Sequence, residues 1–274
     1  MAKWIVGNWK MNGSLTQVEQ FVAEFLPGLP DGFEESGLRV VICPPHPYLA
    51  AAGQRLAGSG VALGAQKVHP LPSGAFTGEV SPTMLRELGV TACIIGHSEH
   101  RQHFAVTDAI IAEKLHGLIA EQITPILCVG ETLAEREAGQ QEQVIEAQLM
   151  EALKESEGKP AGRRQGDRVN LAHPALSPEA ANMLTVAYEP VWAIGTGKTA
   201  TPELAGEMHG HIRAILDGHY GAALAHKVPL LYGGSVTPDN AGQLLSQPEV
   251  DGVLVGGASL KASSLLSIVN HALN

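Results

Sequence analysis

Short apolar runs recur along the whole chain, and each is followed by a longer stretch with helical periodicity. Most of the runs are continuously apolar rather than alternating, which is typical of parallel strands that are covered on both faces. The pattern predicts eight strands: Trp4–Val6, Leu38–Cys43, Val61–Ala65, Ala92–Ile95, Ile123–Val129, Leu184–Ala187, Val228–Tyr232 and Gly252–Val255.

The stretches between these runs predict amphipathic helices. Apolar residues from Val18 to Leu26 fall on one helical face, and Ser14 with Gln17 three residues later is a capping-box pattern. Thr201-Pro202-Glu203 also marks a helix start, because a cap, a proline and an acidic residue follow one another there.

Eight strand–helix alternations without a break in composition predict an α/β fold, a single (β/α)8 barrel that spans residues 1–274 as one domain. A doubly wound sheet is the alternative. One zone, residues 154–180, is polar, rich in Gly and Pro, and lacks a sustained period. We expect an extended surface loop there.

The composition narrows the classes of partner. The formal net charge of −10 argues against a broad basic surface for nucleic acid, so an anionic substrate would need local donors. Cys43, Cys93 and Cys128 lie in or at the end of apolar runs, which predicts reduced, buried thiols. No signal-peptide pattern or apolar stretch of ~20 residues is found, and we therefore expect a cytoplasmic protein with no membrane span.

Polar residues and glycines follow five of the eight runs. In a (β/α)8 barrel these positions gather at the face that carries active sites. Taken singly, each has an ordinary explanation: a solvated lysine, a core histidine, a capping glutamate, turn glycines. Together, a base, an electrophile and a cation at one face predict an active site. The candidates are Asn8, Lys10, His97, Glu99, Glu189, Ser235, Gly256 and Gly257.

Two other kinds of site have partial signals in the sequence. The segment 195–199, Gly-Thr-Gly-Lys-Thr, looks like the end of a nucleotide-binding P-loop, but the first glycine of that motif would fall on Trp192. Four possible metal ligands crowd one segment: His97, Glu99, His100 and His103. Since no second cluster of acids follows at a strand end, we expect neither a metal nor a cofactor.

Seven motifs make the sequence strongly resemble the triosephosphate isomerase family. They occur in the family's order over nearly the whole chain: GNWKMN at 7–12, GAFTGEVS at 74–81, IIGHSE at 94–99, CVGET at 128–132, AYEPVWAIGTGKTA at 187–200, YGGSVTPDNA at 232–241 and GVLVGGASLKA at 252–262.

The resemblance implies a cofactor-free isomerase of glycolysis and gluconeogenesis that interconverts dihydroxyacetone phosphate and D-glyceraldehyde 3-phosphate through an enediolate. Another phosphate-binding barrel isomerase or epimerase is the alternative. By resemblance, Glu189 is the base, His97 the neutral electrophile and Lys10 the fixed positive charge. Asn8 is a further substrate contact, and Glu99 a supporting carboxylate.

The resemblance also assigns the phosphate site and a lid. Backbone amides hold the phosphate at Gly195, Ser235, Gly256 and Gly257. The lid is the segment 193–197, flanked by hinges at 190–192 and 198–200, and it closes over the substrate.

Four residues at three sites depart from the family pattern. His100 stands where the family usually has Arg, Ala105-Val106 where it has Gly-Glu, and Lys67 where it has Asn. We expect altered packing or stability rather than lost chemistry, and a changed salt-bridge network around Glu99 and Arg101.

Residues 69–80 resemble the loop that docks into a second subunit in this family. In a single chain this loop would project Phe76 into water. We therefore expect a homodimer formed through this loop, with Thr77 near the neighbour's active site.

Overall fold

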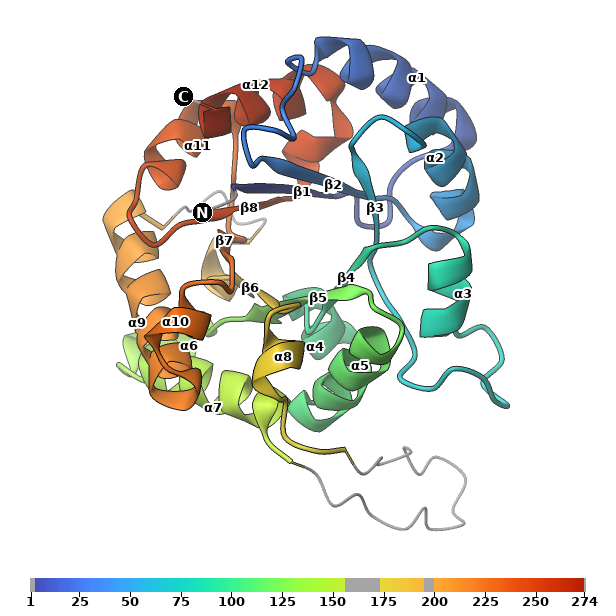
Figure 1. Cartoon of the computed structure of the whole chain (residues 1–274). Coiled ribbons are helices and arrows are strands. Elements are labelled where there is room, and N and C mark those ends of the chain that lie inside the picture. The colour runs from blue at the N-terminus through green and yellow to red at the C-terminus, as the bar shows by residue number, and fades with distance from the viewer. Residues whose placement is uncertain (1–2, 156–172, 195–199, 274) are drawn as a thin grey trace.

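The computed structural model describes residues 3–155, 173–194 and 200–273. Its eight parallel strands form a closed barrel in chain order (Figure 1). β1 pairs with β8, with Trp4 opposite Gly252, so the barrel has no sheet edge. The strands are β1 Trp4–Asn8, β2 Arg39–Cys43, β3 Ala62–Ala65, β4 Ala92–Ile95, β5 Thr124–Val129, β6 Thr185–Tyr188, β7 Leu230–Tyr232 and β8 Gly252–Val255.

This closure confirms the predicted (β/α)8 barrel and excludes the doubly wound sheet. All eight strands lie where the apolar runs predicted them. β7 begins at Leu230 rather than at Val228, and Pro229 has no N–H to donate at the intervening position.

The helices form an outer ring around the barrel (Figure 1). The α-helices are α1 Leu15–Phe25, α2 Leu49–Leu56, α3 Pro82–Glu87, α4 Ser98–Phe104, α5 Asp108–Ala120, α6 Leu133–Glu137, α7 Gln141–Leu153, α8 Pro178–Ala181, α9 Pro202–Tyr220, α10 Ala222–Ala225, α11 Pro238–Leu245 and α12 Ala262–Leu273. The 3-10 helices are η1 Leu26–Gly28, η2 His46–Tyr48, η3 Val191–Ala193 and η4 Gly257–Leu260.

Side-chain caps fix several of these helix starts. The Ser14 hydroxyl accepts from the Gln17 amide at 3.1 Å, which is one half of the predicted capping box. Thr201 caps α9 by accepting from the Leu204 amide at 3.2 Å, as predicted. A complete capping box is found at Thr132, at the start of α6, where none was predicted.

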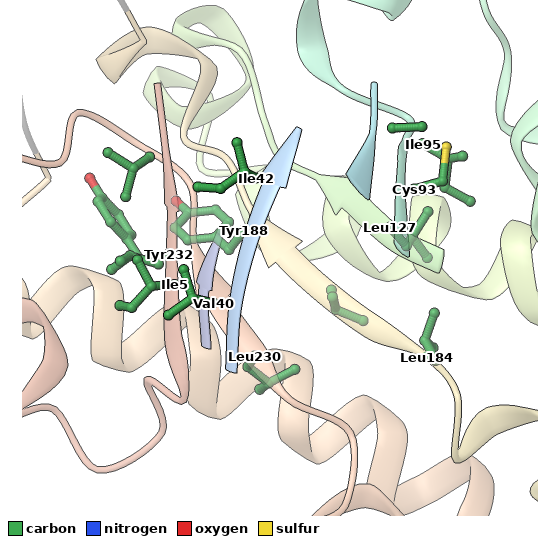
Figure 2. Close-up of a cluster of buried hydrophobic side chains, with 14 of the residues drawn as sticks. Ile5, Val40, Ile42, Cys93, Ile95, Leu127, Leu184, Tyr188, Leu230 and Tyr232 are labelled. Atoms are coloured by element: carbon green, nitrogen blue, oxygen red, sulfur yellow. The ribbon is translucent and has the colours of Figure 1, made fainter. Parts of the chain in front are cut away.

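The hydrophobic core has two layers, because successive residues of each strand point to opposite faces. The barrel interior holds one cluster, which includes Val6, Val41, Ile94, Cys128 and Leu254. The second cluster lies between the sheet and the helices, and Figure 2 shows part of it: Ile5, Ile42, Cys93, Ile95, Leu127, Tyr188 and Tyr232. All three cysteines are buried and free, as predicted.

The zone 154–180 is only partly described, since residues 156–172 lie outside the described residues. The surface loop predicted there stays a prediction. The last part of the zone forms the short helix α8, which Ser177 caps by accepting from the Ala180 amide at 3.2 Å. Four helical residues are too few to show a hydrophobic period.

The 69–80 loop packs partly on its own chain. Its base is closed by a hydrogen bond from the His69 amide to the Val80 carbonyl at 2.8 Å. The Phe76 ring is half-buried and lies against the His69 ring, with centroids 4.1 Å apart. The prediction that Phe76 projects into water in a single chain is therefore wrong, because His69 covers one face of the ring.

Candidate active site

A cavity of about 280 Å³ opens at the C-terminal ends of the strands. The strand ends bring together most of the predicted site residues in its lining: Asn8, Lys10, His97, Glu189, Ser235, Gly256 and Gly257. Glu99 lies beside the cavity, where it binds Lys10. Gly195 lies outside the described residues, as does most of the predicted lid.

Glu189 is 2% exposed and follows β6 directly. Its Oε2 accepts a hydrogen bond from the Ser98 amide at 3.0 Å, and its Oε1 lies 3.0 Å from His97 Nε2. Glycines lie on two sides of it. A Cβ at Gly130 would stand 1.8 Å from the Glu189 carbonyl oxygen, and a Cβ at Gly233 would stand 2.8 Å from Glu189 Cγ. A larger residue at Gly130 would displace the Glu189 backbone, and one at Gly233 would displace its side chain.

His97 is the N-cap residue of α4, and its Nδ1 accepts from the Glu99 amide at 3.2 Å. An acceptor nitrogen carries no proton, so this bond places the ring proton of a neutral imidazole on Nε2. That nitrogen is the one that lies beside Glu189. The turn before His97 uses Gly96 at φ 71°, where a Cβ would approach the Cys128 carbonyl oxygen to 2.9 Å.

Lys10 combines a fixed charge with an uncommon backbone conformation. Its φ of 53° lies in the left-handed region, and its amide donates to Asn8 Oδ1 at 3.0 Å. Its Nζ binds Glu99 Oε1 at 2.7 Å. Burial pushes the pKa of Glu99 upward, but the Lys10 hydrogen bond and neighbouring positive charges leave it below its usual value. Non-glycine residues in this region cost about 1–3 kcal/mol and cluster at functional sites.

Glycine-rich turns supply another part of the cavity lining. Gly233, Gly234 and Ser235 line it after β7, and Gly256 and Gly257 line it where η4 begins. None of the described lining residues is an arginine. Backbone amides at such turns suit an anion, even in a chain with a net charge of −10.

The polar network near α4 gives Glu99 and Arg101 different partners. Arg101 pairs with Asp108, and it also donates to the Gly96 carbonyl at 2.8 Å and to the Cys128 carbonyl at 3.2 Å. Glu99 pairs with Lys10 instead. Each acid therefore has its own cation.

Comparisons with known proteins agree with this geometry. A family model described as Triosephosphate isomerase matches residues 3–272. The triosephosphate isomerase of Carboxydothermus hydrogenoformans is 45% identical over 98% of this chain and 98% of its own. That of Delftia acidovorans is 46% identical over 98% of both chains, and that of Chloroflexus aurantiacus is 44% identical over 97% of this chain and 98% of its own.

The chain belongs to the triosephosphate isomerase family. The resemblance seen in the sequence is thereby confirmed, and the other phosphate-binding barrel enzymes are not favoured.

One buried polar group of this family member was not predicted as part of the site. Glu131 follows β5 and has no exposed surface. Its Oε1 accepts from Arg136 at 3.0 Å, from the Tyr188 hydroxyl at 3.2 Å and from Trp192 Nε1 at 2.8 Å. It therefore ties the first predicted lid hinge to the barrel. Its place in CVGET, at a strand end, was the available signal.

Among the residues that the structure describes, the four candidate metal ligands of the sequence do not form a metal-binding group. Within residues 3–155, 173–194 and 200–273, no group of three or more His, Cys, Asp or Glu side chains could hold a metal ion. His97, the first of the four candidate ligands, faces Glu189, while His103 is exposed on α4.

Proposed function

We propose that Glu189, His97 and Lys10 carry the reaction of the triosephosphate isomerase family in this chain. As a member of that family it is an isomerase that interconverts dihydroxyacetone phosphate and D-glyceraldehyde 3-phosphate. The observation that carries the proposal is the meeting of the three side chains at one cavity, with Glu189 and His97 3.0 Å apart.

Glu189 is the base. Its carboxylate takes a proton from the carbon beside the substrate carbonyl and returns it to the former carbonyl carbon, while the hydroxyl proton passes to the former carbonyl oxygen, so two protons change place and the substrate is neither oxidised nor reduced overall. The two carbons pass through an enediolate. The carboxylate lines the cavity and is 2% exposed, so bulk water has little access to the base.

His97 and Lys10 stabilise the negative charge of the enediolate. The Nε2 proton of neutral His97 donates to the oxygens on which charge develops. Lys10 supplies a positive charge, which Glu99 orients through the 2.7 Å ion pair. Asn8 is a further substrate contact, and its Oδ1 also holds the Lys10 amide.

The phosphate lies against backbone rather than against arginine side chains. Ser235, Gly256 and Gly257 are proposed to hold it with their amides, since they line the same cavity as the base. The family resemblance adds Gly195 from the lid. No cofactor is required by this scheme.

The substitution Glu189→Asp tests the base. Shortening the side chain by one methylene moves the carboxylate by about 1 Å, and we expect kcat to fall by about 100-fold or more. The measurement is a coupled assay of dihydroxyacetone phosphate isomerisation without added metal. Exposed Glu146→Asp on α7 is the matched control and should keep full activity. A Glu189→Asp variant as active as the parent removes Glu189 from its role.

We further propose a homodimer through the loop 69–80, with Thr77 near the neighbour's site. Support comes from exposed apolar side chains on α3 and α4: Met84 is 52% exposed, Leu88 just after α3 is 39% exposed, and Phe104 is 67% exposed. Light scattering should give twice the chain mass of 28.8 kDa. A mass of one chain at micromolar concentration contradicts the dimer.

The remaining proposals concern the whole chain. No helix within the described ranges is long and apolar enough to cross a membrane. A triose phosphate enzyme of glycolysis and gluconeogenesis acts where its soluble substrates are, so we propose a cytoplasmic location. The barrel with its outer ring supports one domain for residues 1–274.

A further inference from the structure

A histidine that has no part in the proposed chemistry packs against two strand ends that lead into the site. His209 on α9 has no exposed surface. Burial lowers the pKa of His209 to about 4, so its ring is uncharged at neutral pH. Its Nδ1 lies 2.6 Å from the Ala205 carbonyl oxygen, one turn earlier in the helix, and therefore carries the ring proton and donates it there. This bond fixes the rotation of the ring.

The ring of His209 contacts two tyrosines at once. Tyr188 ends β6 and Tyr232 ends β7, and the two residues lie opposite each other in the sheet. Both belong to the cluster between the sheet and the helices (Figure 2). The centroid of the His209 ring lies 5.9 Å from that of Tyr188, which it meets edge-on, and 6.4 Å from that of Tyr232. The two tyrosine rings are 6.4 Å apart, so the three rings form one cluster at distances typical of aromatic pairs.

Tyr188 connects this aromatic cluster to the segment 190–192, the first predicted hinge. The Tyr188 hydroxyl donates to Glu131 Oε1 at 3.2 Å, and Trp192 Nε1 donates to the same oxygen at 2.8 Å. Tyr188 also directly precedes Glu189, the proposed base. A shift of the Tyr188 ring would therefore disturb the carboxylate that holds Trp192.

Tyr232 connects the aromatic cluster to the turn that is proposed to hold the phosphate. Its hydroxyl oxygen lies directly against Gly234, where a Cβ would stand only 2.2 Å from it. Gly234 and Ser235 both line the cavity. The Gly233 amide, in the same turn, donates to the Tyr188 carbonyl at 2.7 Å. Both tyrosines are thus in contact with this turn.

We propose that His209 is a positioning residue: its ring holds Tyr188 and Tyr232 in place, and through them the Trp192 segment and the turn at Gly234. His209 is not among the residues that line the cavity, so it acts through the two tyrosines. The part of the proposal that concerns phosphate binding rests on the proposed role of Ser235.

Removal of the ring tests the link to the turn. His209→Ala should raise the KM for dihydroxyacetone phosphate and the Ki of inorganic phosphate by about tenfold, because Tyr232 can then move and the turn with it. His209→Phe keeps a flat ring between the tyrosines, so both constants should stay within about threefold of the parent. Unchanged constants in His209→Ala, or a His209→Phe variant as impaired as His209→Ala, overturn this link.

The fluorescence of Trp192 tests the link to the hinge without any turnover. Since the chain has three tryptophans, the signal is taken as the difference between each protein and its Trp192→Phe counterpart. His209→Ala should shift the emission maximum, because Glu131 would no longer accept the indole proton from a fixed position.

A double-mutant cycle shows whether Tyr188 transmits this effect. Tyr188→Phe removes the hydroxyl that binds Glu131 but keeps the ring, and it should shift the emission maximum by itself. In that background His209→Ala should add little further shift. An unchanged maximum in His209→Ala, or additive shifts in the double variant, overturn the proposal.

A control on the same helix separates positioning from stability. Leu216→Ala also removes a fully buried side chain from α9, about 10 Å along the helix from His209. It should lower Tm but leave KM, Ki and the Trp192 emission unchanged, and equal changes in both variants contradict the positioning role. If His209→Ala does not fold, His209→Leu, which refills the space without a flat ring, is read in the same way. The fluorescence needs no activity, so a failure of the proposed chemistry is distinguishable from a failure of this proposal.

Discussion

The position of the Glu189 carboxylate is set by two residues that have no side chain. Gly130 lets the β5 end approach the Glu189 backbone, and Gly233 leaves room for the Glu189 Cγ. The hydrogen bond from the Ser98 amide then holds one carboxylate oxygen, while the other lies beside His97. The side chain of Glu189 thus supplies the carboxylate, but the neighbouring residues determine where that carboxylate lies.

Gly233→Ala should test this placement. The added methyl would stand 2.8 Å from Glu189 Cγ, so the carboxylate has to shift, and kcat should fall by about 100-fold. The coupled isomerase assay measures the loss. Gly218→Ala on α9 is the matched control, because nothing lies within 4 Å of its new methyl. Full activity in Gly233→Ala would show that the base is positioned by something else.

At the scale of elements, a buried ion pair joins α9 to the start of β8. Arg213 donates to Asp251 Oδ2 at 2.6 Å and to the Val228 carbonyl at 2.6 Å, and it also binds Glu249 at 3.1 Å. Asp251 Oδ2 accepts as well from the Leu230 amide at 3.0 Å. The pair therefore connects one helix to the beginnings of two strands, at the end of the barrel away from the site.

Asp251→Asn should destabilise the fold by about 3 kcal/mol, because it leaves the Arg213 charge buried and only partly compensated. Urea unfolding measures the change. Glu249→Gln removes the more exposed partner and should cost about 1 kcal/mol or less. Equal effects of the two substitutions would show that burial does not decide the contribution of this pair.

The sequence pattern was sufficient to locate the strands, because short continuous apolar runs between helical stretches are compatible with few structures other than buried parallel strands. It was insufficient where contacts are long-range. The ion pair between Lys10 and Glu99 joins residues 89 positions apart, and the left-handed φ of Lys10 leaves no local signal. The prediction for Phe76 was wrong for the same reason, because the loop folds back so that the His69 ring covers the Phe76 ring.

For the molecule as a whole, three histidines make stability depend on pH. Burial is the largest cause that lowers the pKa of His100, His116 and His209 from 6.5 to about 4. The unfolded chain therefore binds these protons more readily than the folded one. The part of the unfolding free energy that comes from keeping these three histidines uncharged is fully present above about pH 6.5. It is lost as the pH falls towards 4.

We expect Tm to fall steadily as the pH is lowered from 6.5 to 4.5. Thermal unfolding followed by circular dichroism measures this without an activity assay. The lowered pKa values of Glu79 and Glu99 act in a different window, below their usual value of 4.5. His209→Gln should flatten the slope, because His209 is fully buried in the parent. A Tm that does not change over this range would contradict the depressed pKa values.

The β1–β8 pairing joins the first described strand to the last one. Asn8 and Lys10 follow β1, and Gly256 and Gly257 follow β8, so the proposed substrate site straddles this seam. During synthesis, the residues that complete the site at β8 leave the ribosome long after those of β1. A nascent chain is inactive until β8 emerges, and until then the edge of β1 that pairs with β8 is exposed. Partly made chains of this protein should therefore depend on chaperones more than their apolar content alone suggests.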